Sequence, residues 1–251
     1  MGLLAFNLRI LAFVPLLVAA LAAGQGHTQG RTYATSFESV SEFSRFYIVP
    51  QNYMGTSSHD LSTEVVRSGR FSHKAWMTGP NPASRFWQNN NHRGYPTIQL
   101  YKLPKGAFRT PVKVVFWVWL DMDLNKGEWF SFATLDHTTS NRWDPVLVNL
   151  SDEGFVHLMH IPVNGDSNRT FQTDKIKFPM RQWVELTVVL HFDSKNGYAR
   201  VFQNGELVSS GPVRRGDGWL TQAHFGLYAP PSMTEGVVFN DDLVITEISD
   251  N

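Results

Sequence analysis

The sequence contains no cysteine and no excess of charge of either sign. Its 251 residues include 22 basic and 22 acidic side chains, so the formal net charge is zero. Without cysteine, disulfide bonds cannot stabilise the fold, so its stability is expected to come from a hydrophobic core or from a bound metal ion. Without net positive charge, we expect no general attraction to nucleic acid or to an anionic membrane surface. Local basic clusters still allow an acidic polysaccharide as a partner.

The sequence also lacks the short motifs of several enzyme classes. It has no paired acidic motif of a retaining glucanase, no Gly-x-Ser-x-Gly nucleophile elbow and no glycine-rich phosphate loop. No amphipathic pattern of three helical turns, no internal repeat and no low-complexity tract follows the N-terminal region. These absences argue against a glucanase-type hydrolase and against a helical fold.

One long apolar run is present, at the N-terminus. Residues 1–24 have the features of a secretory signal peptide, with Arg9 before the apolar run and the small-residue pattern Ala20-Leu21-Ala22 near its end. The run is short for a membrane span of about 20 residues. We therefore expect a secreted protein, extracellular or periplasmic, that has no membrane attachment after cleavage. An uncleaved anchor is the alternative.

After a polar leader at residues 25–32, residues 33–251 are expected to form a single domain of short β-strands. In 182–192 apolar and polar side chains alternate, which is the period of a half-buried strand, and the Asn-Gly turns at 196–197 and 204–205 continue it into an antiparallel series. Such strands bury their alternate faces against another sheet, so the sequence predicts an all-β, two-sheet antiparallel β-sandwich. The other expected strands are 35–38, 62–66, 73–77, 97–101, 112–120, 129–135, 146–150, 155–161, 223–228 and 237–248.

The residues of the C-terminal strands resemble a known fold. The order of residues 183–191, 197–205, 225–228 and 238–245 is similar to that of concanavalin A-like lectin and glucanase jelly rolls. Within that class it is most similar to the heparin-lyase-like and alginate-lyase-like polysaccharide lyases. The resemblance spans residues 33–248. It implies a jelly roll with a glycan groove on one sheet and cleavage beside a uronic-acid carboxylate by β-elimination.

Such an elimination needs one group that neutralises the carboxylate, a base that removes the C5 proton and an acid that protonates the departing O4. The irregular segment 89–101 contains residue types for all three roles, with Arg93 or Gln99 expected on the carboxylate. Alginate-lyase-like members carry a Gln-x-His strand, and the matching stretch here has tyrosine in place of that histidine. The alternative is a polar loop that serves only its own backbone. The candidate catalytic residues are His92, Arg93, Tyr95, Gln99, Tyr101 and His191.

Aromatic side chains on one strand offer a surface for sugar binding. Trp117 and Trp119 share a face of 112–120, and sugar rings stack their CH faces on aromatic rings. The alternative is that these tryptophans fill the interior of the sandwich. The candidate substrate-binding residues are Asn91, Lys113, Trp117, Trp119 and Tyr228.

Acidic residues near the two ends of the domain suggest a structural Ca²⁺ site. Glu38 lies in the first expected strand, and Asp241 and Asp242 lie in the last. In related jelly rolls these strands are neighbours, and carboxylate oxygens suit a hard cation. No cofactor is expected for the chemistry itself.

Three functions are compatible with these features. The first is a secreted, monomeric polysaccharide lyase that acts on an acidic polysaccharide or oligosaccharide. The second is a non-catalytic glycan-binding or cell-surface adhesion module on the same fold, because a fold alone does not assign chemistry. The third is a structural or adhesion domain that binds no glycan.

Overall fold

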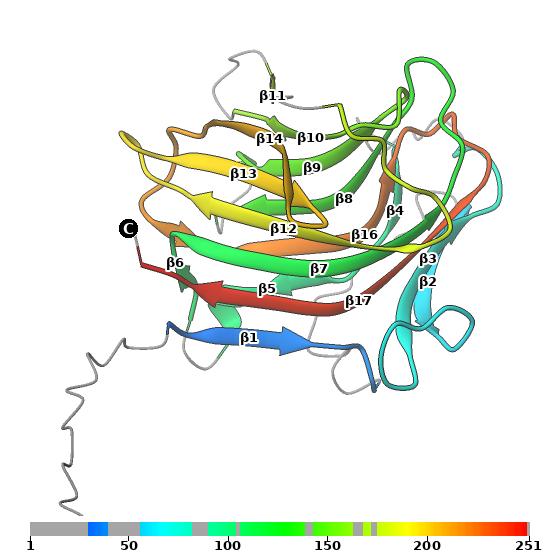
Figure 1. The fold of residues 1–251 in the computed structure, drawn as a ribbon, viewed down its shortest axis with the longest axis horizontal. Helices are drawn as coiled ribbons and strands as arrows, with labels where there is room; N and C mark the ends of the chain where they lie inside the picture. Colours follow the sequence, from blue (N-terminus) through cyan, green and yellow to red (C-terminus); the bar gives the residue numbers. More distant parts are fainter. Residues whose placement is uncertain are drawn as a thin grey trace, which may run out of the picture.

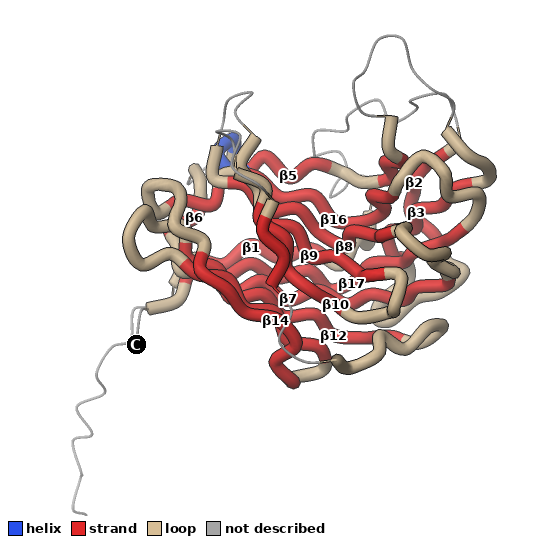
Figure 2. Tube along the Cα trace, turned by 90° about the horizontal axis from the view of Figure 1, so that it is seen from above, coloured by secondary structure: helices blue, strands red, loops and turns tan. Residues whose placement is uncertain are grey.

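The computed structural model describes residues 30–39, 56–81, 90–103, 106–138, 143–162, 168–171 and 175–249. The expected signal peptide, residues 1–24, lies outside these ranges. Within them the chain forms strands and one short 3-10 helix, η1 (Leu100–Lys102), and the antiparallel strands form a two-layered sandwich (Figures 1 and 2). The predicted all-β jelly-roll class is thus confirmed. In the same ranges, no helix has the length and hydrophobicity needed to cross a membrane.

Two large antiparallel sheets make up the sandwich. Sheet A has the strand order β14-β13-β12-β7-β17-β3-β2, with β1 also paired to β17. Its strands are β1 (Thr32–Thr35), β2 (Ser57–Ser62), β3 (Ser72–Met77), β7 (Val112–Asp121), β12 (Trp183–His191), β13 (Tyr198–Gln203), β14 (Glu206–Pro212) and β17 (Gly236–Glu247).

Sheet B has the strand order β11-β10-β9-β8-β16-β4, with β5 also paired to β16. Its strands are β4 (His92–Gly94), β5 (Thr97–Gln99), β8 (Trp129–Asp136), β9 (Val146–Ser151), β10 (Val156–His160), β11 (Arg169–Phe171) and β16 (Gln222–Ala229). A small third sheet pairs β6 (Phe108–Arg109) with β15 (Trp219–Leu220).

The core lies between sheets A and B and follows from the alternation in the sequence. In β7 every second side chain, from Val112 to Leu120, is at most 1% exposed, while the intervening residues face outward. Sheet B contributes an equivalent apolar face, and Phe116 of β7 meets Phe225 of β16 edge to face, with ring centroids 5.1 Å apart. Burial of these faces is the main driving force for assembly of the sandwich.

The C-terminal strand occupies the middle of sheet A. β17 pairs with β7 on one side, and on the other side with β3 along its first half and with β1 along its second half. The first and last strands are therefore neighbours, as the resemblance implied. Between Asp241 and Val244 the register shifts by a bulge, and Asp242 has a φ of 47°.

Three of the expected strands differ from the observed ones by more than one residue at an end. The first strand ends at Thr35, because Phe37 takes a φ of 57° and leaves the sheet. The strand expected at 62–66 is β2, which ends at Ser62, and the residues after it form bends. The strand expected at 97–101 ends at Gln99, where η1 begins.

Candidate functional site

Polar side chains from five neighbouring strands line up across the outer face of sheet B. The strand register pairs Arg93 with Tyr228, Tyr228 with Ser131, Ser131 with Asn149, and Asn149 with His157. Residues paired in register project from the same face of a sheet, so these five side chains form one row. The opposite face of the same strands packs into the core.

One end of this row borders a cleft of about 80 Å³. We call it the Arg93 cleft. At its mouth the amide Nδ2 of Asn91 donates a hydrogen bond of 2.9 Å to the hydroxyl of Tyr228. The guanidinium of Arg93 lies 5.3 Å from the centroid of the Tyr228 ring. A cation, an amide and a phenol therefore converge at one point. The cleft is lined by Arg93, Tyr95, Thr134, Trp143, Leu147, Ile161, His224 and Tyr228.

His224 forms the inner part of the cleft. Its imidazole stacks on the ring of Tyr95 with centroids 4.6 Å apart, and Trp143 stacks on it at 5.4 Å. Burial and the positive charge of Arg93 lower the pKa of His224 from 6.5 to about 3. The imidazole is consequently neutral at ordinary pH, and it carries no positive charge that would compete with Arg93 for an anion.

Amide groups extend the polar surface beyond the cleft. Gln99 and Gln222 face each other across β5 and β16, and the side chain of Gln222 donates a hydrogen bond of 3.1 Å to Asp136. Burial raises the pKa of Asp136. The side-chain oxygens of Gln99 and Asn149 are buried and have no hydrogen-bond partner within the described part of the chain. Both oxygens are thus inaccessible from the surface of sheet B.

The structure brings together four of the residues selected from the sequence and places a fifth nearby. Asn91, Arg93, Tyr95 and Tyr228 meet at the cleft, and Gln99 lies on the same face of sheet B. Sequence reasoning missed His224, Gln222 and Asn149. His224 and Tyr228 are four residues apart in a strand and thus share a face, so the alternation in β16 carried the signal for His224.

Two other candidates from this segment point away from the cleft. His92 neighbours Arg93 in a strand and therefore faces the interior, where its Nε2 lies 3.0 Å from the carbonyl oxygen of Met233 and burial lowers its pKa. Tyr101 lies in η1, where its backbone N–H donates to the carbonyl of Thr221. The expectation that both join Arg93 in one site needs correction, because strand alternation and the end of β5 separate them.

The remaining sugar-binding and base candidates lie on the opposite sheet. Lys113, Trp117, Trp119 and His191 project from the outer face of sheet A, so they cannot line one groove with Arg93. The guanidinium of Arg67 also covers the Trp117 ring at 3.7 Å. The candidates selected from the sequence therefore lie on two different sheets and cannot form one groove.

The three acidic residues expected at a Ca²⁺ site surround one turn, residues 67–70. Asp241 accepts hydrogen bonds of 3.0 and 3.2 Å from the backbone N–H groups of Arg67 and Ser68. Asp242 accepts a hydrogen bond of 2.7 Å from the hydroxyl of Ser68 and forms an ion pair with Arg67. Glu38 accepts one of 2.9 Å from the backbone N–H of Arg70.

This arrangement fits a hard cation only in part. Within the described ranges, no three His, Cys, Asp or Glu side chains are grouped closely enough to hold a metal by themselves. However, Oε1 of Glu38 is buried without a hydrogen-bond partner, and burial raises the pKa of Asp241 to about 6. A nearby Ca²⁺ would favour the charged form of both carboxyl groups, Glu38 and Asp241. A structural Ca²⁺ therefore remains a prediction.

The fold and the cleft define a jelly-roll β-sandwich with a polar row across one sheet. Neither a scan of protein-family models nor a search of curated proteins finds a match to the sequence. Solved structures match the fold. An endo-β-1,4-glucuronan lyase from the fungus Trichoderma reesei superposes with a TM-score of 0.60 at 12% identity, covering 86% of this chain and 95% of that one.

Two further solved structures share the fold. The cellulose-induced protein Cip1 superposes with a TM-score of 0.60 at 16% identity, covering 87% of this chain and all of that one. A sialidase matches with a TM-score of 0.51 at 10% identity, over 88% of this chain and 19% of its own. The resemblance to the jelly rolls of polysaccharide lyases is thus confirmed for the fold. The shared fold does not identify a reaction, because a reaction depends on the residues of the site.

Proposed function

We propose that this protein is a secreted polysaccharide lyase that cleaves an acidic, uronic-acid-containing polysaccharide by β-elimination in the Arg93 cleft. The observation that carries the proposal is the convergence of Arg93, Asn91 and Tyr228 at the mouth of the cleft. The fold shared with a glucuronan lyase supports the same class of reaction. The apolar N-terminal run, residues 1–24, supports export.

These three side chains carry out two tasks in the proposed reaction. Arg93 and Asn91 donate hydrogen bonds to the C6 carboxylate, which stabilises the negative charge that develops when the C5 proton leaves. In its phenolate form, Tyr228 accepts this proton on its oxygen. The electron pair forms the C4–C5 double bond, the C4–O4 bond breaks, and Tyr228 returns the proton to O4.

The residues behind this group hold it in place. Tyr95 and Trp129 contact the ring of Tyr228 at centroid distances of 6.3 and 5.1 Å, which limits its rotation. Neutral His224 leaves Arg93 as the positive charge of the cleft. Gln99, which is half-buried on the same face of sheet B, is available to contact a neighbouring sugar unit.

The experiment is an assay of several uronic-acid polymers, in which the ultraviolet absorbance of the unsaturated product reports cleavage. Tyr228→Phe removes one hydroxyl and keeps the ring. Because proton transfer contributes a factor of about 10²–10⁴ to a rate, this variant should lose that much kcat with little change in KM. Arg93→Gln should lose kcat as well as affinity. Tyr101→Phe, which changes a tyrosine outside the cleft, is the matched control and should keep its activity.

A non-catalytic glycan-binding module is the second candidate, and the small volume of the cleft, about 80 Å³, favours it. In that case no unsaturated product forms from any polymer. Acidic oligosaccharides then bind equally well to the wild-type protein and to Tyr228→Phe, while Arg93→Gln weakens binding.

A further inference from the structure

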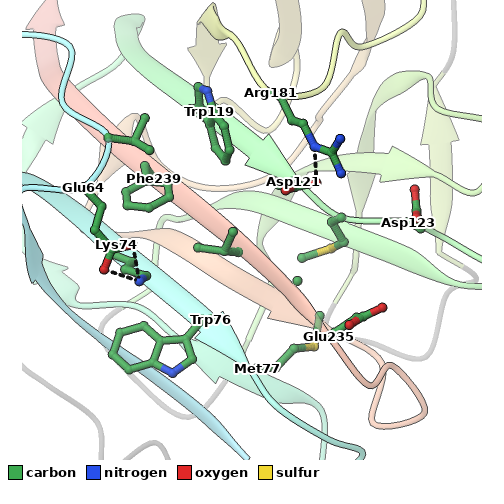
Figure 3. A pocket seen from close by; sticks show the side chains of 14 residues that line it. Glu64, Lys74, Trp76, Met77, Trp119, Asp121, Asp123, Arg181, Glu235 and Phe239 are labelled. Carbon is green, nitrogen blue, oxygen red and sulfur yellow. Dashed lines mark hydrogen bonds and ion pairs between the residues drawn. The ribbon is translucent and has the colours of Figure 1, made fainter.

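A second and larger cavity opens on the outer face of sheet A, on the side of the sandwich away from the Arg93 cleft. Its volume is about 500 Å³. Small-molecule sites commonly have volumes of about 300–1,000 Å³. The cavity lies over β3, β7 and β17, and Figure 3 shows the side chains around it. The proposed lyase reaction uses none of them.

Aromatic rings form one wall of this cavity. Trp119 of β7 and Phe239 of β17 are register partners, and their rings meet edge to face with centroids 5.5 Å apart. Trp76 of β3 adds a third ring beside them (Figure 3). Trp76 and Trp119 are only half-buried, so part of each indole surface remains accessible. Such surfaces suit the apolar CH faces of a sugar ring.

Lys74 occupies the place that a cationic ligand would take at these rings. Its Nζ lies 5.3 Å from the Trp76 ring and 5.7 Å from the Phe239 ring, and both carboxylate oxygens of Glu64 accept hydrogen bonds of 2.6 Å from it. On another side of the cavity, Nε of Arg181 donates a hydrogen bond of 2.8 Å to Asp121. A ligand with an ammonium group would meet two cations already present.

The cavity is also unsuited to an acidic sugar. Its charged lining consists of four carboxylates and two cations, which gives a net charge of minus two. Both cations are paired with carboxylates, and Asp123 and Glu235 supply the remaining negative charge (Figure 3). A polyuronate would be repelled. The hydroxyl groups of a neutral sugar can instead donate to these carboxylates and accept from Lys74 and Arg181.

We propose that this cavity is a second glycan-binding site, which takes an uncharged, β-linked oligosaccharide of glucose-like or xylose-like configuration. In such rings the substituents are equatorial and both ring faces present CH groups, which matches the indole surfaces of Trp76 and Trp119. The site would hold the protein on a neutral polymer while the opposite sheet acts on an acidic one.

Calorimetric titration of the full protein with cellohexaose and with xylohexaose tests this proposal. Binding of at least one of them is expected, and Trp76→Ala and Trp119→Ala should each weaken it by about fivefold or more, because an aromatic partner is removed. Trp219→Ala is the matched control, since Trp219 is 36% exposed and lies in the separate β6–β15 sheet, where its ring faces Arg109. Circular dichroism shows whether each variant keeps its fold, and Trp76→Phe should retain most of the affinity.

Three results would overturn the proposal: no binding of either oligosaccharide, equal binding by the wild-type, Trp76→Ala and Trp119→Ala proteins, or displacement of the bound oligosaccharide by a glucuronate or glucosamine oligomer. The test is independent of the lyase proposal, because Tyr228→Phe should bind the neutral oligosaccharide as the wild type does. If no polymer is cleaved, the second site can still be present.

Discussion

Two neighbouring histidines, one half-buried and one buried, should make the protein sensitive to mild acid. His59 of β2 and His73 of β3 both face the interior, and Nδ1 of His59 lies 3.1 Å from Nε2 of His73. Burial lowers the pKa of His59 from 6.5 to about 4, with Asp60 acting in the opposite direction. Burial and the neighbouring His59 lower the pKa of His73 well below 6.5.

Acidification should lower the free energy of unfolding. Between pH 6.5 and about 4 the unfolded chain binds protons at these histidines and the folded chain does not, so the free energy of unfolding falls as the pH falls. For His59 alone, the difference between its ordinary and its folded pKa corresponds to a loss of about 3 kcal/mol at pH 4. Such a loss is a large part of the stability of a typical domain.

Urea denaturation at several pH values, for the wild-type protein and for His59→Gln, measures this contribution. Glutamine can keep a hydrogen bond to His73 but does not titrate, so the variant should lose about 3 kcal/mol less than the wild type on going from neutral pH to pH 4. Asp60→Asn removes a charge that favours protonated His59, and its acid sensitivity should increase. Parallel pH curves for the wild type and His59→Gln would refute the reasoning.

Three further outcomes are expected. Phe116→Ala should lower the free energy of unfolding in urea by about 3–5 kcal/mol, because its ring is 1% exposed and its truncation leaves a cavity against Phe225. Ca²⁺ should raise the melting temperature above about pH 6, because Asp241 is then charged and its burial without a cation destabilises the fold. A melting temperature that neither Ca²⁺ nor a chelator changes would contradict the site. Asn149 matches a glycosylation pattern but is 2% exposed within β9, so intact-mass analysis after expression in a eukaryotic secretory host should find no glycan on it.

The fold could be predicted from the sequence where one face of a strand is uniformly apolar. β7 and β12 carry that pattern, because their inner faces pack into the core for their full length. β2 was expected at the wrong position, residues 62–66, because it is an edge strand of polar composition, Ser57–Ser62, and only Leu61 adds an apolar side chain to its inner face. Local hydrophobic alternation is weak in such a strand, and its position is set by pairing with β3.

The candidate site could be predicted only in part. Residue types near Arg93 indicated the chemistry, and Tyr228 was selected as a substrate-binding residue. Their meeting depends on the pairing of β4 with β16, which joins residues 135 positions apart and cannot be read from local spacing. The same limitation explains Trp119, which the sequence offers as a sugar-binding residue but which projects from the sheet opposite Arg93.

The position of β17 has a consequence for the synthesis of the protein. This strand is the last one among the described residues, yet β1, β3 and β7 all hydrogen-bond to it. Sheet A therefore cannot be completed before residues 236–247 have left the ribosome. Until then β3 and β7 lack β17, the strand that joins them by hydrogen bonds. The strands before β17 should consequently not form a stable sheet A until β17 pairs with them. Removal of residues 240–251 should prevent folding, because it deletes most of β17.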